Sequence, residues 1–265
     1  MGKIAINILA SGDGWTVADL VCGAGPNDRP FEEQHGDISI AVVLEGSFQY
    51  RSECSSEVMS PGSLLLGSYA RSFECSHEHG SGDRCLAVHY TPEFFERAGA
   101  GCVFPVLRIP PIAALAPWVA GAAGAVQPTA GTNLENLAHG LAGAVLETLQ
   151  TNGVSRSASP ADERRISAAL RFIEANLSNP LPLDLLASIA KMSEFHFVRV
   201  FKKVTGVTAH QYILRARLRK AAARLQSGVE PVLEIALDAG FQDLSNFCRT
   251  FRAEFGVSPR VYRGL

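Results

Sequence analysis

The stretch EIALDAGFQDLSNFCRTFRAEFGVSPRVYR, residues 234–263, decides the fold of the carboxyl-terminal part of this chain. A short helix is expected first, and Gly240 then supplies a residue that tolerates the left-handed backbone of a tight turn. Asp243 is a suitable cap for a second helix, which we expect to stop before Gly256. Two helices joined by such a turn form a helix-turn-helix unit, predicted here at about 233–256.

The same pattern occurs a second time, fifty residues earlier in the chain. A short helix, a possible cap at Ser193 and a terminating Gly206 predict a first unit at about 183–206. The first unit has Lys191 where the second has Gly240, and a left-handed conformation at a non-glycine residue costs on the order of 1 kcal/mol. The repeat indicates a duplicated structural unit. The identical pairs are Phe197/Phe247, Arg199/Arg249, Phe201/Phe251, Gly206/Gly256, Val207/Val257 and Tyr212/Tyr262.

The second helix of each unit has one apolar face and one polar face. Arg199 and Arg249 occupy matching positions on the polar faces, and an Arg side chain can donate two hydrogen bonds to a guanine edge in the major groove. Lys202 and Arg252 follow about one turn later and suit a phosphate. The alternative for either Arg alone is an ordinary solvated charge, but the matched pair favours nucleic-acid contact. The core positions of the first unit, spaced as on one helix face, are Phe197, Val200, Phe201 and Val204.

A long helix is expected between the two units, over about 208–227. Roughly 18 residues at about 1.5 Å each give a rod of about 27 Å. That length is near the roughly 34 Å between successive major grooves on one face of a duplex. One chain is therefore expected to place both reading helices in adjacent grooves. The basic residues expected on the exposed side of the rod, as phosphate contacts or solvated charges, are Arg215, Arg217, Arg219, Lys220 and Arg224.

These motifs resemble the DNA-binding domain of the AraC/XylS family of bacterial transcription regulators. The likeness covers about 165–265 and is carried by LRARLRKAAARLQSG, residues 214–228, together with residues 234–263. The resemblance implies two helix-turn-helix units joined by a long helix, with DNA contacts from the third and sixth helices. Carried over by position, the contacts of the third helix are Phe195, Val198 and Arg199, and those of the sixth are Leu244, Ser245, Cys248 and Arg249. Together with the phosphate candidates Lys202 and Arg252, they form the expected DNA-binding set.

Charge is distributed unevenly along the chain. Residues 1–160 carry 8 Lys and Arg against 16 Asp and Glu, whereas residues 161–265 carry 16 against 10. A basic segment of this kind is typical of a surface that meets a polyanion, although chance variation along the chain is the simpler alternative. The asymmetry agrees with double-stranded DNA as the partner of the second part.

The first 92 residues read as short strands separated by turns, as in the alternating stretch 38–51. A hairpin is expected over 72–90, closed around Gly80-Ser81-Gly82. The predicted fold class is α+β. It comprises a small β-barrel or cupin-like regulatory domain with a flanking helical tail at 1–150, a linker at 151–162, and an all-α double helix-turn-helix domain at 163–265.

Two helical segments of the first part need separate interpretation. Residues 109–134 lack charges, but four prolines and many Ala and Gly residues argue against a membrane-spanning helix. The following segment has a one-sided apolar stripe, which predicts packing either within the chain or against a second copy in a homodimer. The stripe consists of Leu134, Leu137, Leu141, Val145 and Leu149.

Cys75, His77, His79 and Cys85 are suitable transition-metal ligands, and alternation in the expected hairpin places them on one face. They are a candidate site for Zn²⁺ or a similar ion. The alternatives are two buried thiols with histidines at a rim, a redox-sensing thiol pair, and a small organic effector held in the barrel. The metal-binding pattern of enzymatic cupins is not reproduced, because His35 has no second His two residues away.

Together these features predict a sequence-specific transcription regulator, activator or repressor, and not an enzyme. Its acidic domain is expected to sense a small-molecule or metal effector or to mediate dimerisation, and the family implies RNA polymerase as a partner. The six scattered cysteines are expected to be reduced thiols in a cytoplasmic protein without a membrane segment or signal peptide. One alternative is a DNA-binding module fused to a metal-dependent cupin enzyme or to a metal or redox sensor. Another is a helical interaction module that does not bind DNA.

Overall fold

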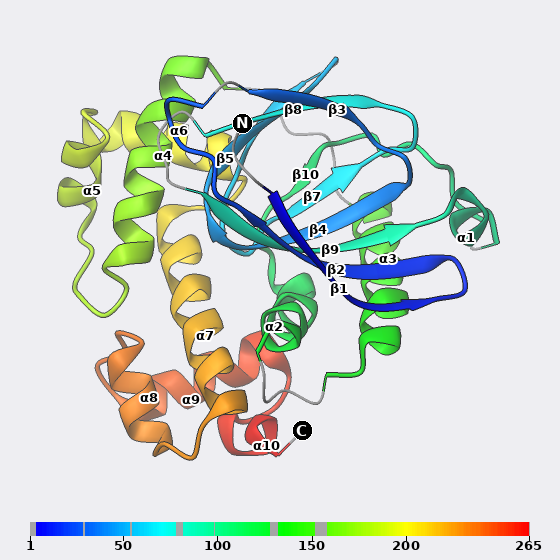
Figure 1. Ribbon diagram of the computed structural model, residues 1–265. Coiled ribbons are helices and arrows are strands. Elements are labelled where there is room, and N and C mark those ends of the chain that lie inside the picture. Colours follow the sequence, from blue (N-terminus) through cyan, green and yellow to red (C-terminus); the bar gives the residue numbers. More distant parts are fainter. Residues whose placement is uncertain are drawn as a thin grey trace.

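The computed structural model describes residues 4–28, 30–53, 55–77, 82–97, 99–127, 132–151 and 158–264 (Figure 1). Strands fill the amino-terminal part and helices the carboxyl-terminal part, so the α+β prediction is confirmed. The strands are β1 (Ile4–Gly12), β2 (Trp15–Cys22), β3 (Phe31–Gln34), β4 (Ile38–Gly46), β5 (Phe48–Ser52), β6 (Ser56–Met59), β7 (Leu64–Gly67), β8 (Ser72–Ser76), β9 (Asp83–Tyr90) and β10 (Arg108–Ile109).

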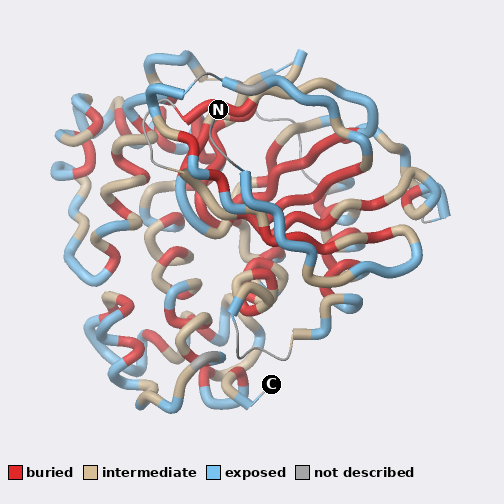
Figure 2. The backbone as a smooth tube through the Cα atoms, viewed as in Figure 1, coloured by how far each residue is buried: buried red, intermediate tan, exposed pale blue. Residues whose placement is uncertain are grey.

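The strands form two antiparallel sheets. One sheet has six strands in the order β1-β2-β9-β4-β7-β10, and the other has four in the order β3-β8-β5-β6. The predicted small β-barrel or cupin-like domain is thus present as two facing sheets and not as a closed barrel. The central strands of the larger sheet are buried on both faces (Figure 2): Val42 and Leu86 lie on the helix-covered side, and Val43 and Cys85 face the second sheet. Burial on both faces explains why β4 reads as an almost continuous apolar run.

The expected hairpin over 72–90 is wrong. β8 pairs with β3 and β5 in the smaller sheet, whereas β9 pairs with β2 and β4 in the larger one. Cys75 is thus opposite Phe31 and Tyr50, and Cys85 is opposite Leu20 and Val43. The turn residues 78–81, with His79 among them, lie outside the described residues. The chain therefore leaves the smaller sheet at Ser76 and enters the larger one at Asp83 instead of closing one ladder.

Helices cover the outer face of the larger sheet. They are α1 (Pro92–Arg97), the 3₁₀ helix η1 (Ala113–Leu115), α2 (Ala116–Ala125) and α3 (Leu134–Thr151). On α3, Leu137, Leu141 and Val145 are buried in the cluster that includes the larger sheet, so the stripe packs within the chain. Among the described residues, no helix has the length and apolar character needed to span a membrane.

The carboxyl-terminal part consists of α4 (Pro160–Ala175), α5 (Leu183–Ile189), α6 (Glu194–Thr205), α7 (Ala209–Ser227), α8 (Val232–Asp238), α9 (Leu244–Phe255) and α10 (Pro259–Arg263). The pairs α5–α6 and α8–α9 are the two predicted units, and the long α7 runs between them (Figure 1). Of the expected linker, residues 152–157 lie outside the described residues, and residues 160–162 form the first turn of α4.

The helix ends follow the sequence signals with one exception. Asp243 accepts a hydrogen bond from the Asn246 backbone nitrogen at 2.7 Å, as expected of a cap. Ser193 occupies the equivalent position before α6 without a side-chain capping bond. Lys191 has φ +52° where Gly240 has φ +94°, so the first unit does hold a non-glycine residue in the left-handed turn.

Candidate nucleic-acid interface and interior cavity

The polar face of α6 is open to solvent. Phe195 is 93% exposed, an unusual position for a large aromatic side chain, and Val198 beside it is also exposed. Arg199 and Lys202 are exposed on the same helix. The opposite face buries Phe197 and its neighbours against α4, α5 and α7. The helix therefore presents an aromatic, an aliphatic and two cationic side chains to whatever approaches from outside.

The corresponding face of α9 is also open. Leu244, Ser245, Arg249 and Arg252 are exposed, and Cys248 is half-buried at the edge of the face. Its apolar side is built from Phe247, Phe251 and Phe255, whose rings pack against one another and against Tyr262. All nine residues of the expected DNA-binding set thus lie on the outer faces of α6 and α9, with only Cys248 partly covered.

The two Arg side chains are held in the same way. Arg249 donates from Nη2 to Oδ1 of Asn246 over 3.1 Å. Arg199 lies with Nη2 at 3.4 Å from Nδ1 of His196. In each case the partner is three residues earlier, and the two partners are themselves equivalent in the repeat. The repeat therefore places two guanidinium groups at matching, exposed positions.

The basic residues of α7 serve another purpose than the sequence predicts. They are engaged within the chain, where they contact α4, the segment between α4 and α5, and the second unit. The four Arg side chains are half-buried and Lys220 is exposed, so the expected exposed position is wrong for the Arg residues and confirmed for Lys220. The contacts are Arg215 with Glu254 (3.0 Å), Arg217 with the Leu177 carbonyl oxygen (2.9 Å), Arg219 with Glu174 (2.9 Å), Lys220 with Ser178 (3.1 Å) and Arg224 with Asp238 (2.9 Å).

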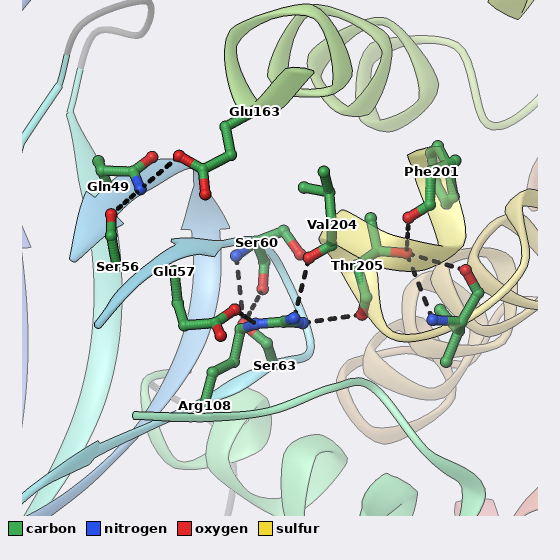
Figure 3. A network of polar contacts seen from close by, with 11 residues as sticks. Gln49, Ser56, Glu57, Ser60, Ser63, Arg108, Glu163, Phe201, Val204 and Thr205 are labelled. Atoms are coloured by element: carbon green, nitrogen blue, oxygen red, sulfur yellow. Dashed lines mark hydrogen bonds and ion pairs between the residues drawn. The ribbon is translucent and has the colours of Figure 1, made fainter. Parts of the chain in front are cut away.

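A buried Arg from the larger sheet contacts the end of α6 (Figure 3). Arg108 donates to the carbonyl oxygens of Val204 at 2.8 Å and Thr205 at 2.7 Å, and to the Glu57 carboxylate at 3.0 Å. The last carbonyls of a helix lack intrahelical partners and carry partial negative charge, so a cation is favourable there. Gln49 and Glu163 make a second contact between sheet and helices, at 3.0 Å.

The segment after Arg108 reaches the second unit. The carbonyl oxygen of Pro111 accepts a hydrogen bond from Arg215 on α7 at 3.0 Å. Ala120 on α2 is buried in the same apolar cluster as Leu218 of α7 and Phe251 of α9. The strand β10 and the helix α2 therefore connect the sheets to both helix-turn-helix units.

A cavity of about 440 Å³ lies between the two sheets. Most of its exposed lining surface is apolar and includes three Ile side chains from β1. Among the described residues that line it none is Lys or Arg, and three are carboxylates. Its ionisable lining residues, apart from cysteines, are Glu33, His35, Asp37, Tyr50, His77, Asp83 and His89.

Burial and hydrogen bonding together set the protonation of the histidines in this cavity. Desolvation lowers the pKa of His35 to about 4, with a smaller contribution from the charge of His89, and Nε2 of His35 lies 2.6 Å from the Tyr50 hydroxyl. Desolvation also lowers the pKa of His89. At His77 burial is outweighed by hydrogen bonds to Asp83 and Cys22, which raise the pKa to about 9. Two neutral histidines and one charged one therefore line the cavity at neutral pH.

The candidate metal ligands are placed differently from the expected hairpin. Cys75 and Cys85 are buried and His77 directly follows β8, all lining the cavity. Among the described residues, one ligand atom from each of His77, Cys22 and Asp83 lies within 4.8 Å of the others. Sequence reasoning missed Cys22 and Asp83 as ligands. No local signal identifies Cys22, because it reaches the site through the pairing of β2 with β9.

A helix-turn-helix domain family matches residues 186–264, which excludes both sheets and the cavity. The HTH-type transcriptional activator AarP of Providencia stuartii is 40% identical over 98 residues, covering 37% of this chain and 73% of that protein. The transposon Tn10 TetD protein of Escherichia coli is 44% identical over 98 residues, covering 37% and 71%. A solved transcriptional regulator with an AraC-type DNA-binding domain from Chromobacterium violaceum matches with 29% identity and a TM-score of 0.38, covering 40% of this chain and 95% of that one.

Proposed function

The chain belongs to the AraC family of DNA-binding transcription regulators, and we propose that it reads its operator by laying α6 and α9 in successive major grooves of one duplex. The observation that carries this proposal is the exposure of Arg199 and Arg249 at equivalent positions of two repeated units. Exposed guanidinium groups on a reading helix suit guanine edges, and the neighbouring Lys202 and Arg252 suit phosphates.

The test begins with selection of the operator from a random DNA library by the full chain. Binding of the selected sequence and of random DNA is then compared for the wild type, Arg199→Ala, Arg249→Ala and the double variant. We expect each single change to weaken operator binding more than random binding, and the double change to remove most of the preference. Arg97→Ala is the matched control, since Arg97 is an exposed Arg on α1. Equal losses on both DNAs would contradict base reading by these side chains.

For the sheets, we propose a regulatory role in which the cavity holds a small organic effector. The chemistry of the lining favours a neutral or cationic molecule with an apolar body, since the described lining is largely apolar and contains three carboxylates without Lys or Arg. The imidazolium of His77 in this lining is already paired with Asp83, so a carboxylate effector would compete with Asp83 for it, and an unpaired buried charge is costly. The contacts of Arg108 and α2 provide a route from the sheets to both reading units.

Three probes of nearly the same size test the charge preference: phenethylamine, 2-phenylethanol and phenylacetate. We expect the amine, and more weakly the alcohol, to raise the melting temperature of the full chain, and phenylacetate to leave it unchanged. Asp37→Asn should reduce the advantage of the amine over the alcohol. A preference for phenylacetate would contradict the proposed selectivity. The proposed operator recognition would stand, because it does not depend on which ligand the cavity prefers.

We propose that the chain acts in the cytoplasm, contacts RNA polymerase at the promoter and works as a homodimer, as the family resemblance implies. The apolar stripe of α3 is occupied within the chain, so a dimer would need another surface. We also propose that the cavity binds its ligand without transforming it. Analytical ultracentrifugation of the full chain, with and without operator DNA, tests the dimer directly.

A further inference from the structure

Three potential metal ligands from both sheets meet at one end of the cavity. Cys22 is the last residue of β2 and Asp83 the first residue of β9, and the two are directly opposed in the antiparallel register. Directly opposed residues project to the same face of a sheet. His77 follows β8 of the other sheet, and its Nε2 is hydrogen-bonded to the Asp83 carboxylate. One ligand atom from each of the three residues lies within 4.8 Å of the others.

The backbone holds the two strand ends together at this point. Gly82 has φ +76°, and its nitrogen donates to the carbonyl oxygen of Ala24 at 2.8 Å. A Cβ atom at Gly82 would lie 2.3 Å from the Cys22 carbonyl oxygen, a distance that side chains do not tolerate. Glycine is therefore required where the chain brings Asp83 beside Cys22. The juxtaposition results from the strand register and from the backbone conformation of Gly82, not from a chance approach of flexible side chains.

The three side chains form a chemically matched ligand set. A thiolate, an imidazole and a carboxylate are the ordinary protein ligands of Zn²⁺, and three of them leave one tetrahedral position open. The thiolate disfavours Mg²⁺ and Ca²⁺, which prefer oxygen ligands. Cys22 and His77 are 8% and 5% exposed, so an ion held there would be largely shielded from water. A further thiol is close, with Cys85 Sγ at 3.4 Å from Asp83 Oδ1.

We propose that Cys22, His77 and Asp83 bind a divalent, thiophilic metal ion of the Zn²⁺ type. The ion replaces the hydrogen-bonded protons of the site: the Cys22 thiol and the His77 imidazolium each release one proton to the solvent when the metal binds. Bound metal joins the ends of β2 and β9 in the larger sheet to the end of β8 in the smaller one. The site does not depend on how the helices read DNA, so it stands or fails separately from the proposed operator recognition.

The experiment uses the full chain, purified in a phosphine reductant and stripped of metal with a chelator. Titration with Zn²⁺ and Co²⁺ is expected to saturate at one ion per chain, measured by elemental analysis. The Co²⁺ form should show a thiolate-to-cobalt charge-transfer band and the strong visible bands of a tetrahedral site. Cys22→Ser should abolish the charge-transfer band. His77→Gln and Asp83→Asn should each weaken Zn²⁺ binding by more than the roughly 10–100-fold typical of losing a supporting residue.

A matched control separates this site from incidental thiol binding. Cys102→Ser changes a half-buried cysteine outside both this site and the DNA-binding set and should leave stoichiometry and spectrum unchanged. Operator binding by each variant reports that the chain is folded. Zn²⁺ should also protect Cys22 of the wild-type chain from alkylation, a measurement that needs no variant. A wild-type chain that binds neither ion, or a charge-transfer band that persists in Cys22→Ser, overturns the proposal.

Discussion

Arg108 in β10 donates from Nη1 to the carbonyl oxygen of Thr205 at the last turn of α6, over 2.7 Å. The Arg108 side chain is only 2% exposed, and its Nε forms an ion pair with the Glu57 carboxylate at 3.0 Å. A buried cation thus caps the carboxyl end of α6, although the two residues lie almost one hundred positions apart. The contact makes the orientation of α6 dependent on the sheets that enclose the cavity.

Arg108→Met is expected to destabilise the chain by roughly 3 kcal/mol, because it leaves Glu57 and two helix carbonyl groups without their buried partner. Urea denaturation of the full chain measures this change. Arg97→Met is the control, since Arg97 and Asp13 form an ion pair at 3.1 Å that is largely exposed. Exposed pairs contribute about 0–1 kcal/mol. Similar losses in the two variants would show that the Arg108 contact does not hold the helices to the sheets.

Arg249→Ala is expected to reduce operator affinity by about 1–3 kcal/mol and to relax the preference for one base position. The guanidinium of Arg249 is exposed and oriented by Asn246, so its loss removes a donor without disturbing the core. Competition binding against a set of operators with single base changes measures the preference. An unchanged ranking of those operators would contradict direct reading by Arg249.

Arg252→Ala is expected to behave differently, because Arg252 is proposed to contact phosphate. It should weaken binding to all sequences alike and reduce the slope of log affinity against log salt by about 0.9, the value for one phosphate contact. Titrations over a series of salt concentrations provide this slope. A change in base preference with an unaltered slope would indicate that Arg252 contacts a base and that the phosphate contact belongs to Arg249.

The left-handed turn of the first unit offers a matched pair of substitutions. Lys191→Gly should stabilise the chain by up to about 1 kcal/mol, because Lys191 has φ +52° and glycine adopts that conformation without strain. Gly240→Ala should destabilise it, since a Cβ atom there would lie 2.2 Å from the Leu177 carbonyl oxygen. Thermal melting of both variants tests the pair. Destabilisation by Lys191→Gly would indicate that the Lys side chain contributes more than its backbone strain costs.

The helical part of the fold could be predicted because its signals are local and repeated. Each signal is visible within a few residues of sequence: the apolar spacing of Phe197 and Phe201, the cap at Asp243, and the glycine that ends the second helix of each unit. The fifty-residue repeat then fixes which residues are equivalent. Both units, their outer faces and the long helix between them follow from these signals.

The sheet part could not be predicted to the same depth because its pairings are distant in sequence. β8 and β9 are close in sequence, a spacing that predicts a hairpin, but each pairs with strands from elsewhere in the chain. Cys22 meets Asp83 only through the register of β2 with β9. The cations of α7 were misassigned for a related reason, since partners such as Glu174 and Glu254 lie about forty residues away.

His35 should make the stability of the chain depend on pH between about 4 and 6.5. Its pKa is lowered to about 4 in the folded chain by burial, whereas an unfolded His has a pKa of about 6.5. Between these values the unfolded chain binds a proton that the folded chain excludes, so the free energy of unfolding falls as the pH is lowered. The full shift corresponds to about 3 kcal/mol.

The measurement is the urea midpoint of the wild type and of His35→Gln at pH 7.5, 6 and 5, chosen as roughly spanning the titration window. Gln keeps a hydrogen-bonding group near the Tyr50 hydroxyl but does not titrate. We expect the variant to lose less stability than the wild type as the pH falls, with the remaining dependence arising partly from His89, whose pKa is also lowered by burial. Parallel curves would mean that His35 takes up its proton in the folded chain, and hence that the cavity admits enough water to solvate a charged imidazolium.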